Sequence, residues 1–495
     1  MTDPTNNNID YSPSKRPAWL SSVRTIALIW LIGTVLGAVF LALIGSASFG
    51  AGLLSAGLGL LKIFAAIGVV VLVFYAPLMW GIRRWWTSYK ARHTFHNDQN
   101  EKALHKFIVN PAALFGIITI FWAFLIAIFG YVIAPDNTSF ANRQVLEIEK
   151  EKPGFHLDFL QVRTNRSEEK TNVFKLLLNG RVSNYREVPI LDHRVEGDSL
   201  IVTYYRGKDL NPERKAYGLV DIEYAKSYDD PTVIQEGDAY VFTDIEGNEQ
   251  RVDREALVAS IQNDRIVHRR FLFGTDQEGR DYLSRILIGT RISLSVGFLA
   301  VSVALLIGLT LGAVAGYFRG KVDDLILWFI NVFWSIPTLL LVFPIAFAFG
   351  MKEWTIYLAV GLTMWVDIAR IVRGQVLGVR EMEYVDAARS LGFGHTRIIF
   401  RHILPNIMGP VIVITAANFA YAILIEAGLS FLGIGAQPPK PSWGQMIAKN
   451  KDNIAYGDPH LALIPGFAIV LLVLSFFLIG NGLRDALDAK TRIDH

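Results

Sequence analysis

The sequence predicts an all-α polytopic membrane protein with one inserted β-rich soluble segment. Hydrophobic residues make up 52% of the 495 residues and charged residues only 19%, whereas soluble domains carry about 25% charged residues. Mean hydropathy is positive, at +0.34, and long tracts have almost no charge. The polar exception runs from residue 134 to 270, where short alternating stretches are typical of β-strands.

Eight tracts are long enough to cross a bilayer, which requires about 20 apolar residues in a helix. They lie at 24–46, 63–82, 111–133, 292–315, 323–349, 354–376, 407–433 and 461–483. Each is expected to be helical because a backbone in lipid must satisfy its own hydrogen bonds. Lys62 precedes the second tract and is expected to reach the outer edge of the bilayer. The adjoining stretch 51–61 is then interfacial, re-entrant or transmembrane.

Basic residues indicate the orientation of these tracts, because lysine and arginine accumulate on the cytoplasmic side. If every tract crosses once, the flanking basic residues all fall on one side. Both termini are then cytoplasmic, and the segment 134–270 lies outside. The residues concerned are Lys15, Arg16, Arg24, Arg83, Arg84, Arg92, Arg319, Lys321, Arg370, Arg373, Arg380, Arg389, Arg397 and Arg401.

The chain accordingly divides into six regions. They are a cytoplasmic tail (1–23), two helices with a basic linker (24–104), a third helix (105–133), the outer β-rich segment (134–270), a region with five spans (271–488) and a second tail (489–495). Within the outer segment we expect strands at 158–164, 199–205, 218–224 and 239–245. We also expect a hairpin turn at 178–181, because Asn-Gly accepts positive φ, and a short helix at 255–264.

The sequence predicts no catalytic centre and no metal or cofactor site in this chain. The absence of cysteine excludes disulfides, Cys-ligated zinc, iron–sulfur clusters and thiol catalysis. The stretch GYFRGKVDD (316–324) has too short a spacing for a phosphate loop, and Val322 stands where a serine or threonine would bind magnesium. The net charge of +3 gives no reason to expect nucleic-acid binding.

Acidic residues in or near the spans are candidates for a polar pathway, because intramembrane acids usually face a cavity or a partner. Glu426 either lines a translocation pathway or pairs with a neighbouring helix. Asp367 is a weaker candidate, since Arg370 follows it at the i,i+3 spacing of a helical ion pair. Asp323 and Asp324, at the inner end of a span, are expected to be hydrated.

A charged segment between two apolar tracts, at 381–405, has an unusual pattern. MEYVDAARSLG fits an amphipathic helix with Tyr384, Val385, Ala388 and Leu391 on one face. Gly392 and Gly394 are expected to end this helix, because glycine tolerates the left-handed C-cap conformation. A second short helix follows up to Ile403, and Pro405 disfavours a helical Leu404. The result is a bent cytoplasmic element with small residues that allow close approach of another protein.

The spacing of Asp386, Ala387, Ala388, Gly392, Leu404 and Pro405 resembles the EAA signature of bacterial ABC importer permeases. Aspartate stands in for the usual glutamate, and His402 for the usual isoleucine. Further stretches resemble the second permease subunit of the dipeptide/oligopeptide/nickel family, at 274–297, 316–324, 401–406, 426–444 and 482–488. The two N-terminal helices and the segment 134–270 are additions to that family's pattern.

The resemblance implies a six-helix type I importer core in a bacterial inner membrane, with the extra parts appended. It implies a translocation pathway for di- or oligopeptides, shared with a second homologous permease. Two ATPase subunits would bind ATP and Mg²⁺, and an external solute-binding protein would deliver the cargo. The coupling residues would be Glu383, Asp386, Ala387, Ala388, Arg389, Gly392, Leu404 and Pro405. Nickel or another small solute is an alternative cargo, and a membrane sensor with an outer ligand-binding domain is an alternative function.

Overall fold

A computed structural model describes residues 104, 106–166, 172–208, 210–350 and 352–487. The tails at 1–23 and 489–495, Lys62 with the stretch 51–61, and the helices expected at 24–46 and 63–82 lie outside the described residues. The chain divides into two units, Met1–Ile118 with Asp485–His495, and Thr119–Arg484. In the first unit, Asn110 caps the start of a helix by accepting hydrogen bonds from the backbone of Ala112 and Ala113.

Five helices in the described part are long and apolar enough to cross a membrane, in agreement with five predicted tracts. The second of them has 37 residues and is about 55 Å long at 1.5 Å per residue. It therefore extends beyond the bilayer's hydrocarbon core of about 30 Å. The five are α4 (Pro111–Ile133), α8 (Tyr282–Phe318), α11 (Glu353–Val379), α14 (Leu404–Phe431, with the preceding turns from His395) and α16 (His460–Leu487).

The stretch 323–349 was predicted as one continuous helix, and this is wrong because it contains two helices. α9 (Gly320–Trp334) and α10 (Thr338–Ala348) meet at an angle of 99°. Pro337 lies in the break, directly before α10, and a residue that precedes proline is disfavoured in the α conformation. The pair is a broken span or a re-entrant loop; if it is one span, the described part has six.

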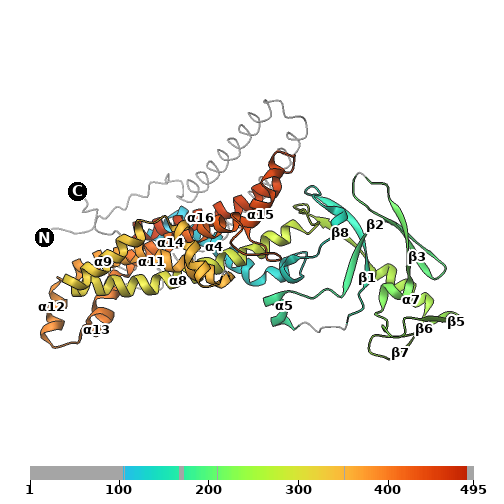
Figure 1. Cartoon of the computed structure of the whole chain (residues 1–495), viewed down its shortest axis with the longest axis horizontal. Helices are drawn as coiled ribbons and strands as arrows, with labels where there is room; N and C mark the ends of the chain where they lie inside the picture. The colour runs from blue at the N-terminus through green and yellow to red at the C-terminus, as the bar shows by residue number, and fades with distance from the viewer. Residues whose placement is uncertain (1–103, 105, 167–171, 209, 351, 488–495) are drawn as a thin grey trace, which may run out of the picture. The chain divides into compact units, whose positions relative to one another are not determined.

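The polar segment contains two antiparallel sheets (Figure 1). The larger has the order β4-β3-β2-β1-β8, and the smaller has the order β5-β6-β7. Alternate residues such as Leu200 and Val202 are fully buried between the large sheet and its helices. The strands are β1 (Phe155–Arg163), β2 (Tyr185–Glu196), β3 (Ser199–Tyr204), β4 (Glu213–Gly218), β5 (Val233–Glu236), β6 (Ala239–Thr243), β7 (Glu249–Asp253) and β8 (Ile266–Phe271).

Pairing of β1 with β8 brings the two ends of this segment together. Phe155 lies opposite Phe271 in the antiparallel register. Farther along, the Asp136 backbone N–H donates to Ser284 Oγ at 2.9 Å, which joins the chain after α4 to the first turn of α8. The segment is therefore tied to the helices at both of its ends.

Two local predictions in this segment are wrong. Residues 218–224 end β4 and then form α6 (Leu219–Glu223), because Leu219, Val220 and Ile222 are all buried on one side of a helical turn. The Asn-Gly at 179–180 ends a helix, α5 (Val173–Asn179), and no hairpin forms there. Gly180 does have the positive φ that the dipeptide suggested, at 77°. The expected helix at 255–264 is confirmed as α7 (Arg254–Ser260) and a following π-helical turn (Ile261–Arg265).

Candidate functional site

The segment with the EAA-like spacing forms two short helices around a glycine turn, α12 (Glu383–Ser390) and α13 (His395–Ile398). Gly392 has φ of 75°. Its N–H donates to the Arg389 carbonyl at 2.9 Å, and the Phe393 N–H donates to the Ala388 carbonyl at 3.1 Å. These two bonds make a Schellman C-cap, as predicted for Gly392. The same prediction is wrong for Gly394, which has an extended φ of −65° and ψ of 151° and precedes α13.

α12 buries only a narrow face. Val385 and Ala388 are buried, whereas Asp386 and Ala387 are exposed. The predicted apolar face is therefore partly wrong, because Tyr384 and Leu391 are exposed too, Leu391 at 72%.

The remaining predicted coupling residues also lie in this element. Glu383 is exposed in the first turn of α12, where a carboxylate is favoured by the helix dipole. Arg389, in the last turn, donates to Asp386 at 3.0 Å. Leu404 is half-buried and Pro405 exposed, in the first turn of α14.

The expected interruption at Leu404 does not occur. Residues 399–403 form a π-helical turn that leads directly into α14. Proline is tolerated in the first turn of a helix because its missing N–H is not needed there. Asn406 then donates to Tyr384 Oη at 3.0 Å, so the start of α14 is bonded back to α12.

The C-terminal end of α8 contacts both α12 and α13. Tyr317 is buried, and its hydroxyl lies 2.9 Å from His395 Nδ1. The Arg389 guanidinium lies over the Tyr317 ring at 5.5 Å, within the range of a cation–π contact. Arg380 donates to the Tyr317 carbonyl at 2.6 Å. One residue of α8 therefore contacts α11's end, α12 and α13.

A buried ion pair fixes the neighbouring helix ends. Arg373 of α11 donates two hydrogen bonds to the Asp323 carboxylate of α9, at 2.5 and 2.7 Å. The expectation that Asp323 is hydrated is wrong, since the residue is 7% exposed. A bidentate arginine supplies both the charge and the geometry that a buried carboxylate requires.

A stripe of glycines on α8 went unnoticed in the sequence. Gly308, Gly312 and Gly316 recur every four residues, the small-xxx-small pattern of close helix packing in membranes. A Cβ on Gly312 would lie 2.5 Å from the Ala369 carbonyl oxygen on α11. The spacing alone would have predicted close packing of α8 against another helix, and the structure shows that this helix is α11.

The two candidate pathway acids have different surroundings. Glu426, on α14, is 1% exposed and accepts hydrogen bonds from Ser430 and Ser442, both at 2.7 Å. Asp367, on α11, is exposed. No ion pair joins Asp367 to Arg370 among the residues that the structure describes, and Arg370 instead lies over the Trp334 ring at 3.8 Å.

A pocket of about 690 Å³ opens at the Tyr282 end of α8. Its walls come from the loop before α8, the end of α14 and the helix α15 (Trp443–Asn450). Ser430 belongs to this wall, so Glu426 lies directly behind the pocket's lining. The charged residues around it include Asp276, Arg280 and Lys449.

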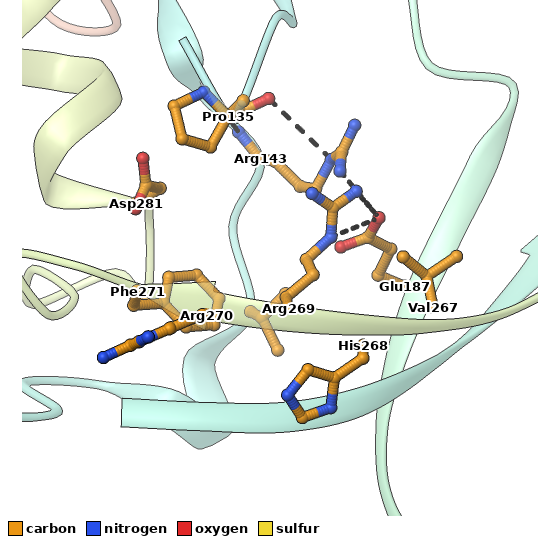
Figure 2. Close-up of a pocket in the computed structure, with 12 residues that line it drawn as sticks. Pro135, Arg143, Glu187, Val267, His268, Arg269, Arg270, Phe271 and Asp281 are labelled. Atoms are coloured by element: carbon orange, nitrogen blue, oxygen red, sulfur yellow. Dashed lines mark hydrogen bonds and ion pairs between the residues drawn. The ribbon is translucent and has the colours of Figure 1, made fainter. Parts of the chain in front are cut away.

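Charged residues of the sheets and of this end of α8 lie around one pocket. Asp281 caps α8 by accepting hydrogen bonds from the Ser284 N–H, at 2.8 Å, and from the Ser284 hydroxyl. These two bonds lower the pKa of the Asp281 carboxyl, but its burial raises that pKa by more. Figure 2 shows Arg143 and Arg269 converging on Glu187 beside a pocket of about 200 Å³. Their distances to the Glu187 carboxylate are 2.6 and 2.5 Å. α8 thus has the sheets at one end and the two short helices α12 and α13 at the other.

Known proteins resemble this chain over its second half. Residues 308–493 match the family described as "Binding-protein-dependent transport system inner membrane component". The chain is 44% identical over 220 residues to the dipeptide transport system permease protein DppC of Alkalihalophilus pseudofirmus, which covers 44% of this chain and 72% of the relative. The chain belongs to the family of dipeptide and oligopeptide transport permeases.

Other members of this permease family match the same region. Glutathione transport system permease protein GsiD of Pectobacterium atrosepticum is 42% identical over 219 residues, which is 44% of this chain and 72% of the relative. Oligopeptide transport system permease protein OppC of Haemophilus influenzae is 41% identical over 220 residues, which is 44% of this chain and 70% of the relative. Among solved structures, the MetNI methionine ABC transporter matches with a TM-score of 0.33 and 19% identity, over 41% of this chain and 96% of the other.

No cluster of three or more His, Cys, Asp or Glu side chains suited to a metal ion occurs within the described ranges. The groups brought together at α12 and α13 are arginines, small residues and aromatic rings.

Proposed function

We propose that the chain is a permease subunit of an ATP-driven importer and forms a membrane pathway for di- or oligopeptides with a second homologous permease. Family membership supports the permease role, and the names of the relatives favour peptides over nickel or another small solute. Two separate ATPase subunits carry the ATP and Mg²⁺, and an external solute-binding protein delivers the cargo. This chain itself binds membrane lipid, no cofactor and no nucleic acid.

The observation that carries the proposal is the form of residues 381–405, which we call the coupling element. Its base is fixed by Val385 and Ala388, while Ala387 and Leu391 are exposed. When the ATPase pair closes on ATP, it grips this exposed surface. The displacement passes through Tyr317 into α8, because Tyr317 contacts both His395 and Arg389. The helices then tilt together, which opens the pathway by rigid-body motion.

The same proposal sets the orientation in a bacterial inner membrane. Arg319, Arg370, Arg380 and Arg397 lie in or beside the coupling element's end of the spans, and such an excess of positive charge is typical of the cytoplasmic side. The two sheets then lie on the extracytoplasmic side, and both termini of the chain are cytoplasmic.

A charge at position 387 tests the coupling surface. Ala387→Lys is expected to reduce recovery of the ATPase subunits with the purified permease about tenfold, because an uncompensated charge would be desolvated in the contact. Co-purification from detergent, quantified by band intensity, measures this. Ala387→Ser is the matched control and should retain the ATPases. Equal recovery with Ala387→Lys and Ala387→Ser would contradict an ATPase contact at this helix.

We propose that the two-sheet segment docks the loaded binding protein, and its deletion tests this. Phe155 and Phe271 are register partners, and such Cα atoms lie about 5 Å apart, so a short Gly-Ser linker can replace residues 156–270. The deleted complex is expected to keep its ATPases and partner permease but to lose the binding protein in a pull-down. Loss of the partner permease instead would favour a stabilising cap between the two permeases.

A further inference from the structure

The helix pair α9–α10 crosses the membrane, because its two ends lie on opposite sides. α9 begins at Gly320, directly after the end of α8. Arg380, at the end of α11, donates to the Tyr317 carbonyl of α8 at 2.6 Å, so α8 and α11 end on the same side. The apolar stretch of α11, Trp354–Val379, has 26 residues, enough to cross, and therefore begins on the other side. Since α10 leads into that beginning, the pair is a broken span.

The break between the two helices lies inside the hydrocarbon core of the bilayer. α9 has 15 residues and α10 has 11, which gives lengths of about 22 Å and 16 Å at 1.5 Å per residue. Neither helix alone covers a core of about 30 Å. The backbone therefore leaves the helical conformation within the membrane, at residues 335–337.

Backbone groups at this break have no hydrogen-bond partner in the part of the chain that the structure describes. The N–H groups of Thr338, Leu339 and Leu340 precede the first bond of α10, from the Leu341 N–H to the Pro337 carbonyl, and no side chain caps them. All residues from 334 to 340 are exposed. Because lipid offers no hydrogen bonds, backbone of this kind is tolerated only against protein or in a water-filled cavity.

An exposed carboxylate lies in the neighbouring helix, α11. Asp367 is at the middle of the stretch Trp354–Val379 and is exposed. The two arginines that follow it on α11 have other contacts, Arg370 with the Trp334 ring at 3.8 Å and Arg373 with the Asp323 carboxylate at 2.5 Å. A charge near the bilayer centre is costly against lipid, so intramembrane acids face a cavity or a partner.

The contact of Arg370 with Trp334 brings the carboxylate and the break to one face of the chain. Trp334 is the last residue of α9 and borders the break. Asp367 and Arg370 are three residues apart on α11 and so share a side of that helix. Two groups that lipid cannot satisfy therefore adjoin, and water satisfies both the free N–H groups and the charge.

We propose that Asp367 and residues 334–337 line the water-filled translocation pathway, and that Asp367 is a specificity-determining residue that favours cationic groups of the cargo. The assignment to peptide cargo rests on the proposed function, whereas the water-filled face does not. Carboxylates that line a pore select cations by the same attraction. The Arg370 guanidinium, held over the Trp334 ring, leaves the carboxylate open to a passing ammonium group.

Cysteine labelling tests the water-filled face directly, because the chain has no cysteine of its own. In the assembled transporter in lipid nanodiscs, Ser335→Cys is expected to react at least ten times faster than Val470→Cys with a charged methanethiosulfonate reagent. Val470 is the matched control, since it is exposed within the apolar helix α16, where the backbone is continuous. The mass shift of this chain measures the rates with and without ATP.

Three results would overturn the water-filled face. The first is equal reaction rates at the two positions. The second is no reaction of Ser335→Cys in either nucleotide state. The third is reaction only before the second permease binds, which would show that protein covers the break. Labelling does not require transport, so a complex that moves no peptide but has a reactive Ser335→Cys would refute the proposed cargo and leave this face intact.

The role of Asp367 is tested by comparing a cationic with an anionic reagent at Ser335→Cys. The trimethylammonium reagent is expected to gain over the sulfonate reagent from the Asp367 charge. Adding Asp367→Asn should therefore lower the ratio of the two rates at least threefold, whereas Asp367→Glu keeps the charge and should keep the ratio. An unchanged ratio in Asp367→Asn, or an equal fall in both variants, would overturn the charge preference.

Discussion

Gly392→Val is expected to abolish ATP-driven uptake while leaving the chain inserted in the membrane. Gly392 has φ of 75°, and a residue with a Cβ pays about 1–2 kcal/mol to adopt that conformation. Valine is β-branched, so its cost in this conformation is expected at the upper end of that range. The Schellman bonds from Gly392 and Phe393 would open, so α12 would lose its fixed angle to α13. Uptake of labelled peptide by reconstituted vesicles, with ATPase turnover measured in parallel, reports the loss of coupling.

Gly394→Val is the matched control for this substitution. Gly394 is two residues away and equally exposed, but its φ of −65° and ψ of 151° suit a β-branched residue. A Cβ added to either glycine would have no neighbouring atom within 4 Å, so a clash inside the chain cannot explain a difference. Uptake should be near normal in Gly394→Val. Full uptake in Gly392→Val would contradict the assigned coupling role, and equal loss in both would indicate crowding against the ATPase.

The conformation at Gly392 could be predicted from sequence because helix termination by glycine is a local property. The spans could be predicted for a similar reason, since every backbone in lipid must bond to itself. Asp323 was misjudged because its partner, Arg373, lies 50 residues away and no local pattern pairs them. The helix α6 was mistaken for a strand because Leu219, Val220 and Ile222 satisfy both periodicities over so short a run.

The exposed coupling surface was harder to predict in detail. Leu391 was assigned to the buried face by its helical spacing, yet it is 72% exposed. α12 has only eight residues, so the short helix cannot cover all its apolar side chains with the few contacts it makes to α8 and α14. The departure is informative, because an apolar residue left open next to Ala387 belongs to a surface that another protein is expected to cover.

Gly312→Val is expected to prevent close packing of α8 against α11 and to lower the midpoint of thermal unfolding of the isolated permease by several degrees or more. A Cβ on Gly312 would lie 2.5 Å from the Ala369 oxygen and 2.8 Å from Val372 Cβ. Backbone and a fully buried side chain cannot move aside, and overpacking of this kind costs about 1–3 kcal/mol. Since α8 joins the coupling element to the two sheets, transport should fall together with stability.

Gly374→Val isolates the packing effect from the cost of valine in a helix. Gly374 lies on α11, is exposed, and would have no atom within 4 Å of an added Cβ. Both variants carry the same helix-propensity change, so their difference reports the α8–α11 contact alone. Thermal unfolding followed by fluorescence in detergent should show a shift for Gly312→Val that Gly374→Val lacks. Equal midpoints would mean that the glycine stripe at 308, 312 and 316 does not determine how these helices meet.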